Sequence, residues 1–232
     1  MIIAPFASAA DGIAREAALL QAGRAALLLW QADESALVLP SAIARRTGTQ
    51  SVMRDIKRAG LGVVTRGTGG GIVPQGACTL NLAMVLPCPS GFTLEDGYRL
   101  ICGTLTEALS RFDISAHTGA CPGAFCDGAW NVLAGERKLA GTAQRWRSTR
   151  SGRVALLHAA ILLHLPDPGH WAELCLLHQA AFPDAPVLRP EAHAPLFALM
   201  PENMHQTSFP GALIRAAEDR LSSLSLRENQ AA

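Results

Sequence analysis

Apolar residues return at helical spacing in several parts of the chain. Between residues 94 and 112 an apolar side chain recurs every three to four positions, which predicts an amphipathic helix with one buried face. The same spacing predicts helices over residues 8–22 and 50–58. Two further helices are predicted over residues 171–179 and 209–226.

Short continuous apolar runs predict buried strands. Residues 25–30 and 36–39 are two such runs separated by a short polar stretch, so we expect them to pair as a hairpin that ends at Pro40. A second hairpin is expected from residues 131–133 and 138–145. The remaining strands are predicted over residues 61–64, 79–86 and 154–165. Because helices separate only some of these strands, the pattern favours an α+β fold with a sheet covered by helices.

The composition is that of a globular protein without an electrostatic bias. Of the 232 residues, 49% are hydrophobic and 17% are charged, and the formal net charge is +1. A near-neutral chain with 5% aromatic residues does not indicate nucleic-acid binding. No apolar stretch is long enough to span a membrane, and the N-terminus does not resemble a signal peptide, so we expect a cytoplasmic protein with neither membrane nor nucleic-acid partners.

The six cysteines form no CxxC pair, and the histidines show no metal-binding spacing. We therefore expect reduced thiols and no tightly bound metal. On the first helix, Asp11 and Glu16 are interpreted as a cap and a surface charge.

Three consecutive glycines, Gly69 to Gly71, follow a predicted strand within the segment Thr65–Val73. Glycine tolerates positive φ and has no Cβ, so consecutive N–H groups can point at one anion or carbonyl oxygen. The alternative is a tight turn or bulge with no ligand. Neither the nucleotide P-loop nor the dinucleotide-binding pattern fits this spacing.

Lys138 stands among small and apolar residues in the segment 135–145. An ammonium at the edge of an apolar pocket can stabilise negative charge that develops on an acyl oxygen. The alternative is a solvated lysine at the end of a hairpin.

Cys126, followed by Asp127, lies in a loop just before the lysine hairpin. A loop cysteine near an ammonium can act as a nucleophile that accepts an acyl group. The alternative is an inert, half-buried thiol. His158 opens an apolar strand, where a histidine is usually a hydrogen-bonded structural residue.

Together these segments resemble the lipoate–protein ligase and octanoyltransferase superfamily, whose catalytic domain is related to biotin–protein ligase. The glycine segment is similar to the family's Arg-Arg-x-Ser/Thr-Gly-Gly-Gly-x-Val loop, and residues 135–144 are similar to its Gly-x-Arg-Lys-x-x-Gly-x-Ala-Gln hairpin. Residues 157–162 are similar to its His-Gly-Thr-Leu strand. The resemblance implies a mixed, mostly antiparallel sheet flanked by helices, as in class II synthetases. It also implies one catalytic domain over residues 1–232, with a helical extension from about residue 190 and no full accessory domain.

The resemblance also implies an enzyme and its site residues. Lys138 would contact the acyl carbonyl, and Cys126 is the candidate for a transient thioester. The residues that would bind the substrate or an acyl-adenylate are Arg66, Thr68, Gly69, Gly70, Gly71, Asn81, Asp127, Gly141, Thr142, Ala143, Gln144 and His158.

Three functions remain open on this basis. We place first a ligase that uses ATP and Mg²⁺ to activate lipoate or octanoate as an acyl-adenylate. It then attaches the acyl group to a lysine of a lipoyl domain, either in a 2-oxoacid dehydrogenase or in the glycine cleavage H protein. The second is an ATP-independent transferase that takes the group from an acyl carrier protein or another protein thioester through Cys126, and the short chain after residue 190 favours it.

The third is a non-catalytic lipoate-binding protein, which is motivated by departures from the family pattern. Thr65 replaces an arginine, Pro74-Gln75 replaces a His-Asp-like pair, and Ala159-Ala160 replaces Gly-Thr.

Overall fold

The computed structural model describes residues 3–150 and 152–231, with the side chains of the last helix described as far as residue 224. A large sheet is formed by β1 (Ala4–Phe6), β2 (Ala26–Ala32), β6 (Thr79–Pro87), β7 (His117–Gly119), β8 (Asn131–Ala134), β9 (Arg137–Thr149) and β10 (Gly152–Leu162). The spatial order is β1-β2-β6-β10-β9-β8-β7. Only β1 and β2 run parallel among these neighbours, so the sheet is mixed and mostly antiparallel, as expected.

A second sheet of three strands lies beside the first. It contains β3 (Ala36–Pro40), β4 (Gly62–Arg66) and β5 (Val73–Gln75) in the order β4-β3-β5. The glycine segment is the loop between β4 and β5. Strand β3 is parallel to β4 and antiparallel to β5.

The predicted hairpin between the first two apolar runs is wrong. Strand β2 has β1 on one side and β6 on the other, so neither of its edges is free to pair with β3. The connecting turn is held elsewhere, because the N–H groups of Asp33 and Glu34 donate to the carbonyls of Phe6 and Ala7. The chain therefore leaves the large sheet after β2 and starts the small one with β3.

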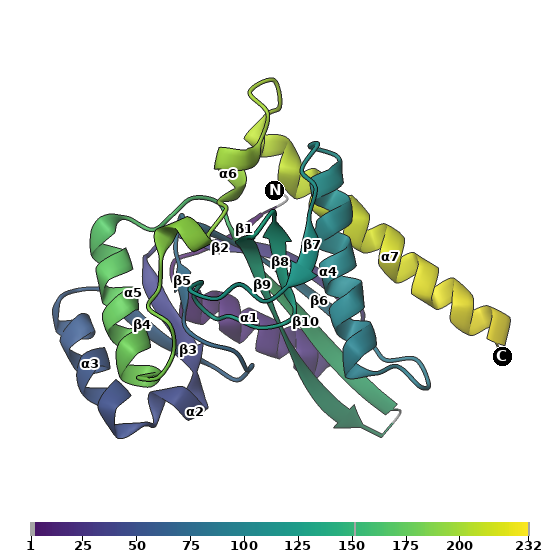
Figure 1. The fold of residues 1–232 in the computed structure, drawn as a ribbon. Coiled ribbons are helices and arrows are strands. Elements are labelled where there is room, and N and C mark those ends of the chain that lie inside the picture. The colour runs from purple at the N-terminus through teal and green to yellow at the C-terminus, as the bar shows by residue number, and fades with distance from the viewer. Residues whose placement is uncertain (1–2, 151, 232) are drawn as a thin grey trace.

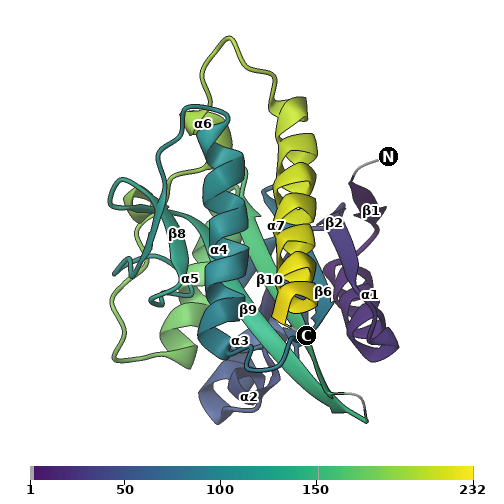
Figure 2. The same cartoon turned by 90° about the vertical axis from the view of Figure 1, so that its right-hand side faces the viewer.

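Helices cover both sheets. They are α1 (Ala9–Ala22), α2 (Ser41–Ala44), α3 (Thr47–Arg58), α4 (Leu94–Ser110), α5 (Pro168–Ala181), α6 (Leu196–Leu199) and α7 (Phe209–Ala231), and the two short 3₁₀ turns are Pro190–Ala192 and Gln206–Ser208. Helices α4 and α7 lie side by side over one face of the large sheet (Figures 1 and 2). Helix α1 packs on the other face, and α3 and α5 pack together beside the small sheet. None of the helices in the described part of the chain is long and apolar enough to cross a membrane.

The core follows this layering. The largest buried cluster fills the space between the large sheet and the α4–α7 pair, and a second cluster joins the small sheet to α3 and α5. Helix α1 begins with a capping box in which Ser8 and Asp11 satisfy each other's backbone N–H groups. Gly12 faces the ring of Trp30, where an added Cβ would overlap the indole. This close approach brings α1 down onto β2 and carries Glu16 toward the interior.

Candidate functional site

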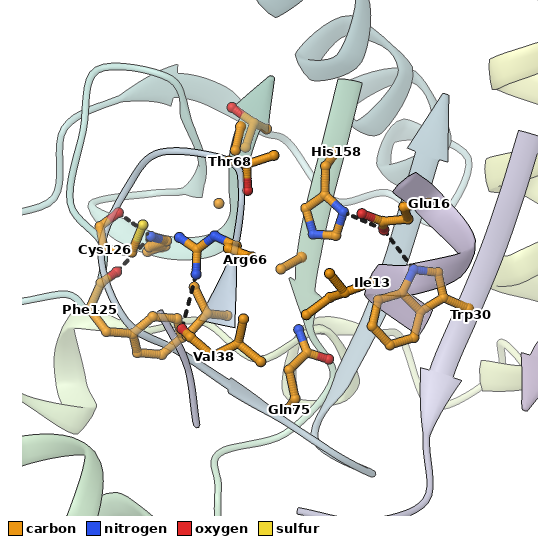
Figure 3. Close-up of a pocket in the computed structure, with 16 residues that line it drawn as sticks. Ile13, Glu16, Trp30, Val38, Arg66, Thr68, Gln75, Phe125, Cys126 and His158 are labelled. Atoms are coloured by element: carbon orange, nitrogen blue, oxygen red, sulfur yellow. Dashed lines mark hydrogen bonds and ion pairs between the residues drawn. The ribbon is translucent and has the colours of Figure 1, made fainter. Parts of the chain in front are cut away.

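A narrow pocket of about 40 Å³ lies between the two sheets and joins the two sequence motifs (Figure 3). Its walls come from α1, the small sheet, the loop before β8, and strands β9 and β10. The lining includes these predicted site residues: Arg66, Thr68, Cys126, Lys138, Gly141, Thr142, Ala143 and His158. The structure thus brings the glycine loop and the lysine hairpin to one cavity.

Cys126 is held in the pocket wall by its backbone conformation and by the glycine loop. Its φ is 51°, a left-handed value that few side-chain-bearing residues adopt. The N–H of Gly71 donates to Cys126 Sγ at 2.8 Å. A Cβ on Gly71 would lie 2.9 Å from Cys126 Cα, so only glycine permits this approach. A donor this close would stabilise negative charge on the sulfur.

Arg66 fixes the shape of the glycine loop. Its guanidinium donates to the carbonyls of Val38 at 2.9 Å, Gly69 at 2.8 Å and Gly71 at 2.7 Å. Burial lowers the pKa of Arg66, and the nearby Cys126 and Glu16 oppose that shift. Arg66 therefore organises the glycine loop and places a positive charge between the Cys126 sulfur and the opposite wall of the pocket (Figure 3).

Lys138 is buried, with only 2% of its surface exposed. Its Nζ donates to the carbonyls of Phe125 at 2.7 Å and Cys126 at 2.8 Å, and it lies 5.2 Å from the centre of the Phe125 ring. Burial lowers the pKa of Lys138, and the charges of Cys126 and Asp127 oppose the shift. An ammonium has three N–H donors, so one is left for a ligand in the pocket. The solvated-lysine alternative is wrong.

The family model described as the lipoyl protein ligase A/B catalytic domain matches residues 9–175. This chain belongs to that family. The prediction of the superfamily and of an enzyme of the ligase and octanoyltransferase type is confirmed.

Among relatives in this family, an uncharacterized protein of Cupriavidus necator is 35% identical over 170 residues, which cover 66% of this chain and 67% of the relative. An octanoyl-[GcvH]:protein N-octanoyltransferase of Kyrpidia tusciae is 33% identical over 120 residues, which cover 49% of this chain and 41% of the relative. The match thus spans less than half the length of that transferase.

Solved structures of the family share the fold. A putative lipoate protein ligase of Thermoplasma acidophilum with bound lipoic acid has a TM-score of 0.71 at 18% identity, over 95% of this chain and 84% of that one. A lipoate-protein ligase A bound with ATP has a TM-score of 0.68 at 20% identity, over 95% and 83%. At these identities the likeness establishes the fold.

His193 supports the loop that carries Cys126, a role that the sequence did not predict. The buried ring accepts the N–H of Phe125 at Nε2 (3.2 Å), and its Nδ1 lies 3.0 Å from the carbonyl of Arg189. The ring stacks on Phe125, with centroids 4.5 Å apart. Its backbone bridges to Lys138, and Ala194 N–H donates to the Lys138 carbonyl. The same segment thus supports both the cysteine loop and the lysine strand.

Glu16 was also misread as a surface charge. It is buried on α1 and lines the pocket. Its Oε1 accepts the indole N–H of Trp30 at 2.7 Å and lies 2.7 Å from Nδ1 of His158. Figure 3 shows this pair and Cys126 on opposite sides of Arg66. The contact fixes the orientation of the His158 ring in the pocket wall.

Several predicted residues lie outside this pocket. Gln144 points to the other face of β9 and donates to the carbonyl of Leu94. Asn81 is buried behind the wall, where it exchanges two amide hydrogen bonds with Gln75. Gly69 is exposed and is not part of the lining. Gly70, Gly71 and Asp127 line a second cavity on the far side of Cys126.

Asp127 organises the cysteine loop. Its Oδ1 accepts the N–H groups of Cys121 at 2.6 Å and Gly128 at 2.7 Å, together with the amide of Asn131 at 3.1 Å. Within the described residues, no three His, Cys, Asp or Glu side chains gather at a point where they could hold a metal ion.

Proposed function

We propose that this protein transfers an octanoyl or lipoyl group through a thioester on Cys126 to a lysine of a lipoyl domain. The observation that carries the proposal is the position of Cys126 Sγ in the pocket wall, 2.8 Å from the N–H of Gly71. The 33% identity to a named octanoyl-[GcvH]:protein N-octanoyltransferase supports it. The acceptor is then a lipoyl domain of a 2-oxoacid dehydrogenase or the glycine cleavage H protein. The donor is an octanoylated H protein or an acyl carrier protein.

In the first half of the reaction, the Cys126 sulfur attacks the acyl carbonyl of the donor. A C–S bond forms, the bond to the donor breaks, and the proton of the thiol passes to the leaving group. Lys138 lines the pocket, and the N–H that is not used by Phe125 or Cys126 would stabilise the oxyanion of the tetrahedral intermediate. In the second half, a neutral lysine amine attacks the thioester, the C–S bond breaks, and the amine's proton returns to the sulfur.

Replacing Cys126 tests this function. The wild-type protein, mixed with an octanoylated H protein or an octanoyl-acyl carrier protein, should gain the mass of one octanoyl group in a bond that hydroxylamine cleaves. Cys126→Ser should lose this adduct and slow transfer to a lipoyl domain by about 1,000-fold or more, because the nucleophile is gone. Cys175→Ser is the matched control, since that half-buried thiol on α5 does not line the pocket. Unchanged transfer by Cys126→Ser would refute the proposal.

An ATP-dependent ligase is the second candidate, because Arg66 and Lys138 place two cations beside the pocket. Against it, most of their N–H groups already donate to protein carbonyls. We assign no residue to Mg²⁺. Pyrophosphate exchange driven by lipoate and ATP, unaffected by Cys126→Ser, would establish the ligase, and its absence would remove it.

A further inference from the structure

A second cavity meets the central pocket at Cys126. This cavity, which we call the α5 groove, has a volume of about 290 Å³. It lies against the end of α5, and its lining includes Gly71, Cys126, Asp127, His178, Phe182 and Ala185. Cys126 lines both cavities and therefore lies at the junction of a narrow pocket and a wider groove.

Transfer through a thioester requires two approaches to Cys126. While the acyl chain is attached to Cys126 and occupies one cavity, the attacking amine must reach the carbonyl carbon from another direction. The central pocket is narrow, at about 40 Å³ against about 290 Å³ for the groove. The groove is therefore the passage with room for a second chain.

The charge of the α5 groove suits an amine better than a phosphate. Asp127 is exposed and is the charged side chain of the lining, which includes no lysine or arginine among the described residues. Burial lowers the pKa of His178, so this ring is neutral near pH 7 and does not repel a cation. Arg66 and Arg189 lie close to Gly70 and Gly123 of the lining, and both guanidinium groups donate to backbone carbonyls.

We propose that the α5 groove receives the lysine side chain of the protein that exchanges the acyl group with Cys126. The apolar surfaces of Phe182 and Ala185 would pack against the methylene stem, while Asp127 attracts the ammonium at the entrance. This inference rests on the proposed function. The ammonium loses one proton to water, and the neutral amine attacks the thioester carbon. The C–S bond breaks as the amide forms, and the second proton of the nitrogen passes to the sulfur.

Filling the groove tests this proposal. The octanoyl-enzyme is prepared with an excess of a small octanoyl thioester, and its discharge is followed by intact mass with either hydroxylamine or a lipoyl domain as acceptor. Ala185→Trp should slow discharge to the lipoyl domain at least tenfold and leave discharge to hydroxylamine within about twofold, because the small amine does not need the groove. Val187→Trp is the control, since Val187 lies two residues further along the chain, is 69% exposed and is not part of the lining.

The outcomes separate the two proposals. If the wild-type protein forms no octanoyl-enzyme, the proposed function fails. If it does, and Ala185→Trp discharges to the lipoyl domain at the wild-type rate, only the groove proposal is overturned. If Ala185→Trp abolishes the binding of ATP but keeps transfer to the lipoyl domain, the groove is a nucleotide site and the groove proposal is also overturned. Ala185→Met introduces a smaller side chain and should slow discharge to the lipoyl domain by an intermediate amount. A graded effect of this kind distinguishes a filled groove from a misfolded protein.

Discussion

Lys138 and Cys126 are coupled through the backbone as well as through the pocket. The ammonium holds the carbonyl of Cys126, so the residue that would stabilise the oxyanion also fixes the conformation of the nucleophile. Removing the ammonium should therefore affect the chemical step more than the binding of substrate.

We predict that Lys138→Met lowers kcat by about 100-fold to 1,000-fold, the usual effect of removing one oxyanion donor. The KM for the acyl donor should change much less, because the apolar pocket is kept and methionine has a similar shape. Steady-state transfer kinetics measure both parameters. Lys57→Met, at an exposed site on α3, should match the wild type. If KM rises while kcat stays constant, Lys138 acts in binding alone.

His193 should make stability depend on pH. Burial, with a contribution from Lys138, lowers the pKa of His193 to about 4, whereas an unfolded histidine titrates near 6.5. The unfolded chain therefore binds more protons between pH 6.5 and pH 4, so stability is lost as the pH falls through this window. At pH 5 the loss should be about 2 kcal/mol relative to pH 7.

Urea unfolding at pH 7 and pH 5 measures this effect. His193→Gln should be less stable at pH 7 and should show a smaller loss between the two pH values. His170 and His178, whose pKa values are also lowered by burial, supply a background that both proteins share. Equal losses in both proteins would show that His193 does not titrate in this way.

The sequence revealed some site residues and concealed others for a physical reason. Arg66, Cys126 and Lys138 stand inside motifs whose small neighbours indicate close backbone approach. Glu16 and His193 lie in ordinary surroundings, and the partners that bury them are far along the chain: 142 positions separate Glu16 from His158, and 68 separate His193 from Phe125. A lone polar residue carries no local signal of such contacts.

The contact between α1 and β2 leaves no room for a side chain at Gly12. Gly12→Ala should destabilise the protein by about 1–3 kcal/mol, because the added methyl group overlaps the Trp30 ring and must push the helix outward. The shift should also weaken the hydrogen bond from Trp30 to Glu16 and reduce transfer activity. Thermal and urea unfolding measure the loss.

Gly48→Ala on α3 provides the comparison. A Cβ there would meet Ala180 O at 3.5 Å, an ordinary contact, and the site is exposed. Its stability should stay within about 0.5 kcal/mol of the wild type. A Gly12→Ala protein as stable as this control would mean that the α1–β2 contact can relax.

The longer helices and strands were predictable, while the short strands β1, β5 and β7, the short helices α2 and α6, and one strand pairing were not. The amphipathic spacing found α4 to within a few residues, and the short turn correctly paired β8 with β9. The same reasoning failed for β2 and β3, because β6, which follows nearly fifty residues later, takes the edge that a hairpin would use. Local pattern indicates that a strand exists, whereas competition among distant strands decides its partner.

The two sheets contribute different parts of the core and of the site. The large sheet with α4 and α7 on one face forms most of the core, and its other face supplies β9 and β10 to the pocket. The small sheet with α3 and α5 contributes the glycine loop and borders the α5 groove. The proposed chemistry occurs between the two sheets, where elements from both surround the Cys126 sulfur.

The contacts of the cysteine loop have a consequence for biosynthesis. Gly71 precedes Cys126 by 55 positions, and the ring that supports Phe125 comes 68 positions after it. A growing polypeptide on the ribosome therefore carries this thiol and Gly71 before His193 has emerged to support the loop. Acyl groups should not be captured until synthesis has passed residue 194, so unfinished chains do not divert them from their acceptors.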